Sequence, residues 1–321
     1  MYGSPSLKQL LPLALLLLAA LAASLQLPDY FIYISNLLMV YLILAIGLDI
    51  VMGWAGQFAF AHVAFYGIGM YGTALLHMRL GLPFIIGMPI AALVAALVGL
   101  LIALPATKLR TVYLALATFA FAECAQWTFR TWDKLTGGPD GLRVTAGNVL
   151  GFSITNDRQA MPVVAVLLIA VLAATLFLQR SSLGRCFFAI RDSEYVAIAS
   201  GIDPKRTKVL ALCISALYAG IAGGASTLFQ SYIHPDSLGS WTLILLLSMV
   251  VVGGSASVAG VALGVVLLGL LPELLRAAPK GVLVWQELIY GLLLMVSVIF
   301  MPRGIWGSLQ TFRKTRRRSK T

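Results

Sequence analysis

The sequence predicts an all-α fold, a polytopic membrane helix bundle of about eight to ten spans, from its composition and its apolar runs. Of the 321 residues, 60% are hydrophobic and 11% are charged, whereas soluble proteins carry roughly 25% charged residues. Apolar runs of about 20 residues, the length that crosses a bilayer as a helix, recur along the chain. Backbone groups in lipid need partners within the segment, and no β-barrel alternation is present, so helices are predicted.

The first apolar run, 10–27, follows Lys8 and has two interpretations. Signal peptides combine a charged start, a shorter apolar core and a small-residue cleavage site, and Ala20-Leu21-Ala22 fits such a site. The run is long for that purpose and leads directly into more spans, which favours a retained first helix. Later spans are predicted at 33–52, 60–78, 83–106, 111–130, 160–179, 208–230 and 285–301.

Basic residues between the spans predict the orientation. The net charge is +11, and Lys and Arg cluster in the loop 180–207 and after residue 301, which places both in the cytoplasm. The chain must leave through 208–230 and return through 285–301, so 241–271 must cross an even number of times. At about 1.5 Å per residue that region is too short for two full spans. It therefore predicts two short or broken helices, the alternative being one tilted helix with the tail outside.

The domain organisation follows from this topology. We expect one transmembrane domain over 1–307, with a cytoplasmic loop at 180–207, and a basic cytoplasmic tail over 308–321. A bacterial inner, cytoplasmic-type membrane is the expected location. Because the positive charge lies at membrane boundaries, contact with lipid rather than with nucleic acid explains it.

The polar side chains exclude several kinds of site. The three cysteines form no Cys-x-x-Cys pair and the three histidines are scattered, so no disulfide framework or metal site is predicted. Neither a Gly-x-x-x-x-Gly-Lys-[Ser/Thr] loop nor any Gly-Lys dipeptide occurs, so the chain does not bind ATP by that route. No cluster of nucleophilic, acidic and histidine side chains indicates a membrane enzyme.

Few ionisable side chains lie within the predicted spans. An ion-coupled secondary transporter uses such groups near the midplane, and this chain offers Asp49, Glu123 and His62. Glu123 lies near the end of its apolar run, where it either serves a function or pairs with Arg130. Ion coupling stays an alternative with thin support.

Glycine-rich stretches interrupt two of the apolar regions. Non-helical backbone at membrane depth is tolerated only against protein or a water-filled path. Paired interruptions of this kind in the two halves of a transporter indicate the substrate path, while the alternative is close packing of small residues. The candidate path residues are Gly53, Gly56, Gln57, His62, Gly253, Gly254, Ser255 and Ser257.

The cytoplasmic loop is predicted to hold a short amphipathic helix over 187–200. Gly201 indicates its C-terminal stop, and Asp203-Pro204 indicates a turn and a restart. Such a helix fits a groove on a soluble partner or lies on the lipid surface. Asp192 and Glu194 give the segment mixed charge, which favours a protein partner.

A turn-rich segment, Leu135–Leu142, is expected on the external side. It either gates the external mouth or meets a binding protein, or it is simply a tight loop, which its composition favours. The residues of interest there are Thr136, Gly137, Gly138 and Asp140.

Taken in order, these segments resemble the LivM-type permease subunits of branched-chain amino acid ABC importers. The family's Gly-x-Ala-Gly-Gln-x-Ser-x-Gly-His stretch is matched from Gly53 to His62. Ala59 replaces the family's serine, and Ala61 replaces the glycine that precedes the histidine. The ordered set is specific although each motif alone is weak, and the resemblance covers roughly 35–307. Further matches lie at 135–142, 181–202, 252–257 and 301–307.

The resemblance implies one half of a transmembrane pair. Its expected partners are a LivH-like second permease, two cytoplasmic ATPase subunits that hold ATP and Mg²⁺, and an extracytoplasmic binding protein; this chain itself is expected to hold no cofactor. Relatives carry branched-chain amino acids, and similar permeases carry urea, amides or aromatic acids, which the sequence does not distinguish. Residues 187–202 correspond to a coupling helix, and the implied coupling residues are Gly184, Arg185, Arg191, Asp192, Glu194, Ala197 and Gly201.

Overall fold

A computed structural model describes residues 28–106, 111–144, 147–149, 152–154, 156–276, 285–300 and 304–308. The predicted first span, 10–27, and tail residues 309–321 lie outside this set. The helices are α2 (Asp29–Asp49), the π-helical turn η1 (Ile50–Trp54), α3 (His62–Leu80), α4 (Phe84–Ala106), α5 (Thr111–Thr131), α6 (Asp133–Thr136), the 3₁₀ turn η2 (Gly138–Asp140), α7 (Asp157–Arg180), α8 (Ser182–Asp192), α9 (Glu194–Ala199), α10 (Pro204–Ser226), the 3₁₀ turn η3 (Pro235–Leu238), α11 (Ser240–Gly253), α12 (Val258–Gly269), α13 (Leu271–Arg276) and α14 (Gln286–Phe300).

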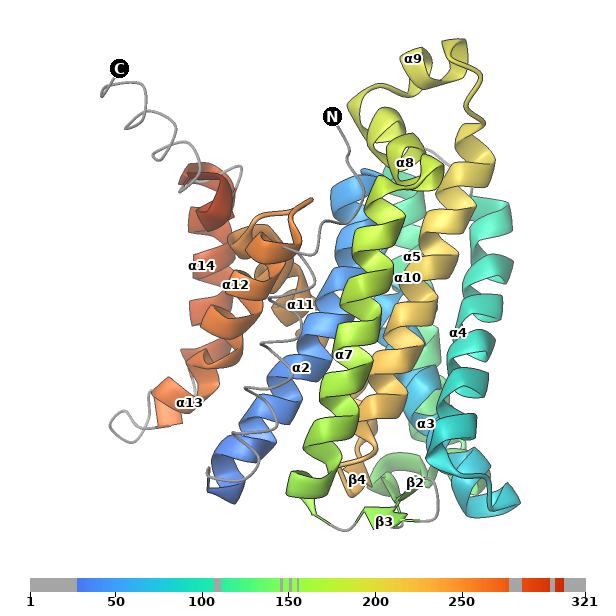
Figure 1. Ribbon diagram of the computed structural model, residues 1–321, viewed down its shortest axis with the longest axis vertical. Coiled ribbons are helices and arrows are strands. Elements are labelled where there is room, and N and C mark those ends of the chain that lie inside the picture. The colour runs from blue at the N-terminus through green and yellow to red at the C-terminus, as the bar shows by residue number, and fades with distance from the viewer. Residues whose placement is uncertain are drawn as a thin grey trace.

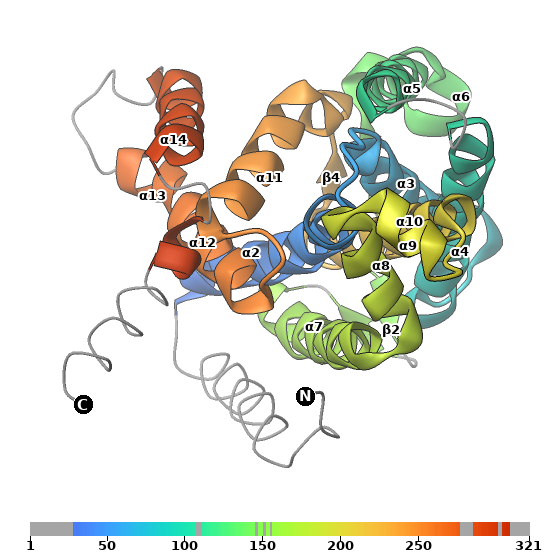
Figure 2. The same cartoon turned by 90° about the horizontal axis from the view of Figure 1, so that it is seen from above.

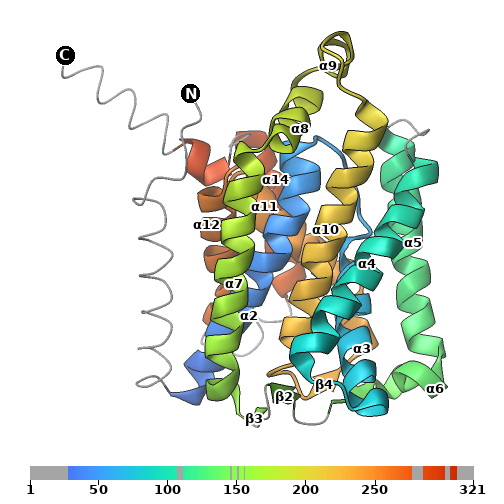
Figure 3. The ribbon, with the colours of Figure 1, turned by 45° about the vertical axis from the view of Figure 1, so that its right-hand side comes forward.

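The predicted polytopic helical bundle is confirmed (Figure 1). Within the described residues, four helical segments are long and apolar enough to cross a membrane, and two shorter apolar helices accompany them. Helices α8 and α9 lie at one end of the bundle and the short strands at the other (Figures 1 and 3). The four segments are Asp29–Trp54, Phe84–Pro105, Asp157–Arg180 and Pro204–Ser226.

The packing centres on α10, which lies among α2, α3 and α4, while α11 to α14 lie on the other side of α2 (Figure 2). Small residues bring these backbones together. A methyl group added at Gly220 of α10 would lie 2.6 Å from the Cα atom of Ala92 in α4. One added at Gly69 of α3 would overlap the carbonyl oxygen of Gly220. Membrane helices associate through such close approach.

Both predicted interruptions are confirmed. The chain is non-helical from 55 to 61, between η1 and α3, and again from 254 to 257, between α11 and α12. The second region is therefore two short helices rather than one long tilted helix. Gly254 (φ 123°) and Ala256 (φ 63°) turn the chain, and the Ser257 hydroxyl caps α12 by accepting the Gly260 N–H at 3.3 Å.

The segment 180–207 differs from the prediction of one helix over 187–200. Ser193 divides it into α8 and α9, because its extended backbone (φ −163°) ends α8 and its hydroxyl caps α9. Gly201 stops α9 as predicted: at φ 81° it donates to the Ile198 carbonyl at 2.9 Å, and Ile202 donates to Ala197 at 3.0 Å. This pair of bonds is the Schellman motif.

Two small antiparallel sheets lie at the opposite end of the bundle. Strand β1 (Leu142–Arg143) pairs with β4 (Tyr232–Ile233), with Leu142 opposite Ile233. Strand β2 (Gly147–Val149) pairs with β3 (Phe152–Ile154). The β1–β4 pair ties the connection after α5 to the connection after α10.

Close packing at α10 predicts a large effect of Gly220→Ala. The added methyl group forces α10 and α4 apart, which we expect to cost ~1–3 kcal/mol as overpacking does elsewhere. The thermal unfolding midpoint of the purified chain in detergent should fall. Gly291→Ala in α14 is the matched control, because nothing lies within 4 Å of its added methyl group. An unchanged midpoint in Gly220→Ala would contradict the packing.

Candidate functional site

The Asp49 carboxylate joins the two interrupted segments. Asp49 ends α2 and is 2% exposed. Its Oδ1 accepts the backbone N–H of Ala256 at 2.7 Å, and its Oδ2 accepts the indole N–H of Trp54 at 3.1 Å. The π-helical turn η1 brings Trp54, five residues later, onto the same face. A buried carboxylate needs such donors, so α2 and the 254–257 turn are held together through this side chain.

Gly53 leaves the room that this contact needs. A methyl group added there would overlap the Asp49 carboxylate and lie 2.6 Å from the Ala256 nitrogen. Ala256 has a left-handed backbone (φ 63°), which costs a non-glycine residue about 1–2 kcal/mol. The bond from Ala256 to Asp49 holds that strained conformation, and strain of this kind concentrates at functional sites.

Helix α8 is attached to the same place. The Arg191 guanidinium donates through Nη1 to the Gly53 carbonyl oxygen at 2.6 Å. Gly56, at φ 66°, packs against the Arg191 backbone. The Phe188 ring stacks on Trp54 with centroids 5.4 Å apart. The last turn of α8 therefore contacts the first interruption directly.

The residues near the end of the described chain complete this cluster. Residues 304–308 are helical, and the Gly304 backbone (φ 67°) lies so close to Gly254 that a side chain there would overlap it. Trp306 lies against Gly260 at the start of α12. The 301–307 motif, as far as it is described, thus contacts the second interruption.

Of the remaining candidate path residues, Ser255 is exposed, whereas Gln57 and His62 have partners inside the protein. His62 is 2% exposed; its two ring nitrogens lie 2.7 Å from the Leu44 carbonyl oxygen and 2.9 Å from the Ser215 hydroxyl. The Gln57 amide donates to the Lys208 carbonyl at 3.4 Å. The structure therefore brings Gly53 beside the 254–257 turn, while Gln57 and His62 contact α10 instead. Their assignment to a substrate path stays a prediction.

Most of the predicted coupling residues hold the local fold through packing or hydrogen bonds, and Asp192 is exposed on the surface. A side chain at Gly184 would overlap the Leu178 carbonyl oxygen, so Gly184 permits the tight turn from α7 to α8. Arg185 donates to the Arg180 carbonyl at 2.9 Å, Glu194 pairs with Lys208 at 2.8 Å, Ala197 is buried, and Asp192 is exposed.

The outer side chains of α9 were missed by sequence reasoning. Tyr195, Val196 and Ile198 are 87%, 64% and 52% exposed. Three exposed apolar or aromatic side chains on a short helix beyond the spans form a surface suited to a partner. The sequence analysis used the charged residues and the turns of this segment and did not consider its apolar residues.

The segment 135–142 is a tight turn. The Thr136 hydroxyl donates to the Phe129 carbonyl at 2.7 Å, and a side chain at Gly137 or Gly138 would overlap neighbouring backbone or Asp133. Asp140 is exposed. The loop interpretation explains its threonine and glycines, and Asp140 faces outward.

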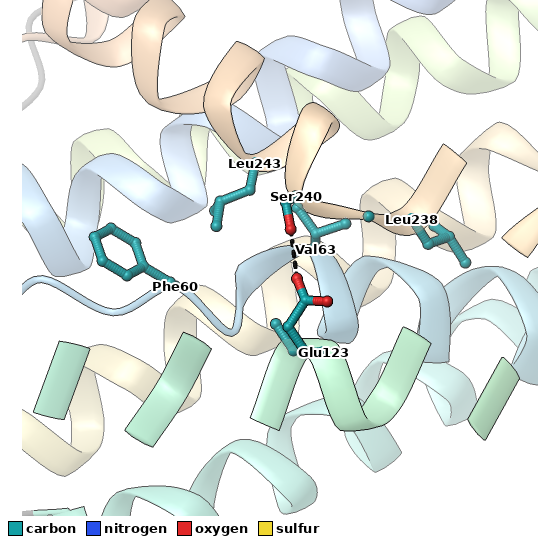
Figure 4. Close-up of a pocket in the computed structure, with 8 residues that line it drawn as sticks. Phe60, Val63, Glu123, Leu238, Ser240 and Leu243 are labelled. Carbon is teal, nitrogen blue, oxygen red and sulfur yellow. Dashed lines mark hydrogen bonds between the residues drawn. The ribbon is translucent and has the colours of Figure 1, made fainter. Parts of the chain in front are cut away.

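Glu123 forms a second polar contact, away from the Asp49 cluster. Its carboxylate accepts a hydrogen bond from the Ser240 hydroxyl at the start of α11 (Figure 4). Arg130 pairs instead with Asp236 at 3.1 Å. The expected alternative of a Glu123–Arg130 pair is therefore wrong, because η3 presents Asp236 to Arg130.

Comparison with known proteins agrees with these features. Residues 30–298 match the family model of the branched-chain amino acid transport system permease component. The chain is 32% identical to the high-affinity branched-chain amino acid transport system permease protein LivM of Escherichia coli (strain K12), over 94% of this chain and 75% of that protein. It is 25% identical to LivH of the same organism, over 83% and 91%. No solved structure matches the chain significantly.

The Asp49 contacts predict that Asp49→Ala destabilises the protein. The change leaves the Ala256 N–H and the Trp54 indole N–H without their acceptor, at about 1–3 kcal/mol for each buried donor. The unfolding midpoint in detergent should fall. Asp29→Ala on the same helix is the control, because Asp29 pairs with Arg158 at an exposed surface, where ion pairs contribute little. Equal unfolding midpoints for the two variants would show that the Asp49 hydrogen bonds do not stabilise the fold.

Proposed function

The chain belongs to the family of permease components of branched-chain amino acid transport systems, and we propose that it forms half of the membrane path of an ATP-driven importer. Similarity to both LivM and LivH proteins supports a pair of related permeases. The observation that carries the proposal is the Asp49 cluster, since it joins a cytoplasmic-loop helix to both interrupted segments.

Coupling to the ATPase subunits begins at α9 in this proposal. Its exposed Tyr195, Val196 and Ile198 dock against a groove on an ATPase subunit. A displacement of α9 moves α8, and Arg191 transmits it to the Gly53 carbonyl oxygen. Asp49 passes the movement to the 254–257 turn. Both interruptions then shift together, which is what opening a path to one side requires.

The other components supply what this chain lacks. ATP and Mg²⁺ are bound by the two ATPase subunits, because the sequence contains no Gly-Lys dipeptide and hence no such loop. A binding protein delivers substrate at the end that carries the β-strands, where Asp140 is exposed. The substrate is a branched-chain amino acid, as the names of the relatives support; urea, amides or aromatic acids are the alternatives.

The proposed function is tested with the assembled importer. This chain is co-expressed with the second permease, the ATPase subunits and the binding protein that are encoded beside it. The purified complex is placed in liposomes with ATP inside. We expect uptake of leucine, isoleucine or valine that requires ATP. Uptake of urea, an amide or an aromatic acid instead would reassign the substrate. Recovery of the chain alone, with uptake driven by an ion gradient, would overturn the importer.

Arg191→Glu is predicted to uncouple ATP hydrolysis from transport. The glutamate carboxylate cannot donate a hydrogen bond to the Gly53 carbonyl oxygen and repels it. The exposed side chains of α9 are unchanged. The ATPase subunits should still co-purify and hydrolyse ATP, while leucine uptake falls at least tenfold. Arg206→Glu is the control, since Arg206 pairs with Asp203 at the exposed start of α10. Normal uptake in Arg191→Glu would contradict the proposal that α8 transmits movement through Arg191.

The chain's C-terminus is proposed to lie in the cytoplasm of a bacterial cell. Residues 304–308 contact the 254–257 turn, which is joined through Asp49 and Gly53 to α8. A cysteine introduced as Arg316→Cys, with the native cysteines replaced by serine, should react with a membrane-impermeant thiol reagent only after the cells are opened. Labelling of intact spheroplasts would place the tail outside.

A further inference from the structure

Glu123 lies in the second half of α5. It is twelve residues after Thr111 in α5, which is about 18 Å along the helix at 1.5 Å per residue. Apart from Gln126, the other residues of the surrounding stretch, 114–129, are apolar or small. An acidic side chain in a mainly apolar helix of a membrane protein marks a candidate functional site.

No basic side chain in the described part of the chain pairs with this carboxylate. Its partner is the Ser240 hydroxyl, and Arg130, one or two turns away, pairs with Asp236. The start of α11 also favours a nearby negative charge. Glu123 is also exposed on this chain, so a cation from outside the chain can reach it.

Beside the carboxylate is a hollow with apolar walls (Figure 4). The hollow is an open depression rather than an enclosed cavity, and residues of α3, α5, η3 and α11 and of the first interruption line it. Its apolar side chains are Phe60, Val63, Leu238 and Leu243. A ligand that fits here carries one positive group beside Glu123 and an apolar remainder.

We infer that Glu123 binds the α-ammonium group of an amino acid as it passes through this hollow. The inference rests on the proposed function and narrows its substrate. An ammonium group donates charge-assisted hydrogen bonds to a carboxylate, while the apolar walls accept an aliphatic side chain. Urea, neutral amides and aromatic acids without an amine carry no ammonium group, so they form no charge-assisted hydrogen bond with Glu123. Glu123 therefore favours amino acids over these compounds.

The hollow is also connected to the coupling cluster. Phe60 belongs to the interruption that Arg191 contacts at Gly56, and its backbone N–H donates to the Thr118 hydroxyl of α5 at 3.0 Å. A shift of this segment therefore changes a wall of the hollow. Binding and release of the ammonium group are in this way tied to the movement of α8.

The test uses the complete importer in liposomes, with leucine-loaded binding protein outside and ATP inside. We expect Glu123→Gln to lower the initial rate of leucine uptake at least tenfold. ATP hydrolysis stimulated by the loaded binding protein should stay within twofold, because the ATPase contacts are unchanged. Glu123→Asp should recover part of the uptake, since it keeps the charge. Cys124→Ser, the exposed neighbour on α5, is the matched control and should stay within twofold.

Each result has a distinct meaning. Normal uptake in Glu123→Gln, with a working wild-type importer, overturns the inference and leaves the proposed function standing. Loss of the second permease from the purified Glu123→Gln complex also overturns it, because the cation is then a basic side chain of that subunit. A wild-type importer that fails to transport leucine contradicts the proposed function and the inference together.

Discussion

The Asp49 carboxylate is the interaction on which the rest of the arrangement depends. It is a single buried acid at the end of α2, and it satisfies donors from η1 and from the turn between α11 and α12. Without an acceptor at this position, the strained Ala256 would lose the bond that holds its left-handed backbone. The contact links residues 207 positions apart, so it fixes how the two interrupted regions sit against each other.

Around this polar centre, the bundle combines a tightly packed part with an adaptable one. Helices α3, α4 and α10 approach through Gly69, Gly220 and Ala92, where no side chain separates the backbones. Such packing resists deformation. The interruptions, by contrast, are short stretches whose backbone is held by a few directed hydrogen bonds. Movement that enters through α8 is therefore expected to be absorbed at the interruptions rather than spread through the packed helices.

Much of the fold was predictable from the sequence, and the reason is physical. Apolar runs long enough to cross a bilayer leave helices as the only way to satisfy the backbone, and glycine-rich stretches such as 253–257 weaken those helices locally. Tertiary pairing was not predictable. Asp49 sits in an apolar run with nothing nearby to indicate that its partner is Ala256. For Glu123, pairing with Arg130 on the same helix was one of two alternatives, and the sequence did not indicate Ser240. The break at Ser193 was also missed, because a serine hydroxyl can cap a new helix as readily as it sits within one.

The most direct test of this account joins α8 to the first interruption by a covalent bond. A methyl group at Gly56 would lie 3.4 Å from the Arg191 Cβ atom, close to the about 3.5–4.5 Å separation of Cβ atoms in disulfides. The double variant Gly56→Cys, Arg191→Cys is made with the native cysteines replaced by serine, and leucine uptake by the assembled importer is measured before and after oxidation. If α8 and the interruption move as one unit, uptake is low when reduced, because the Arg191–Gly53 bond is gone, and recovers on oxidation. Formation of the disulfide without recovery, or full uptake in the reduced protein, would contradict the account.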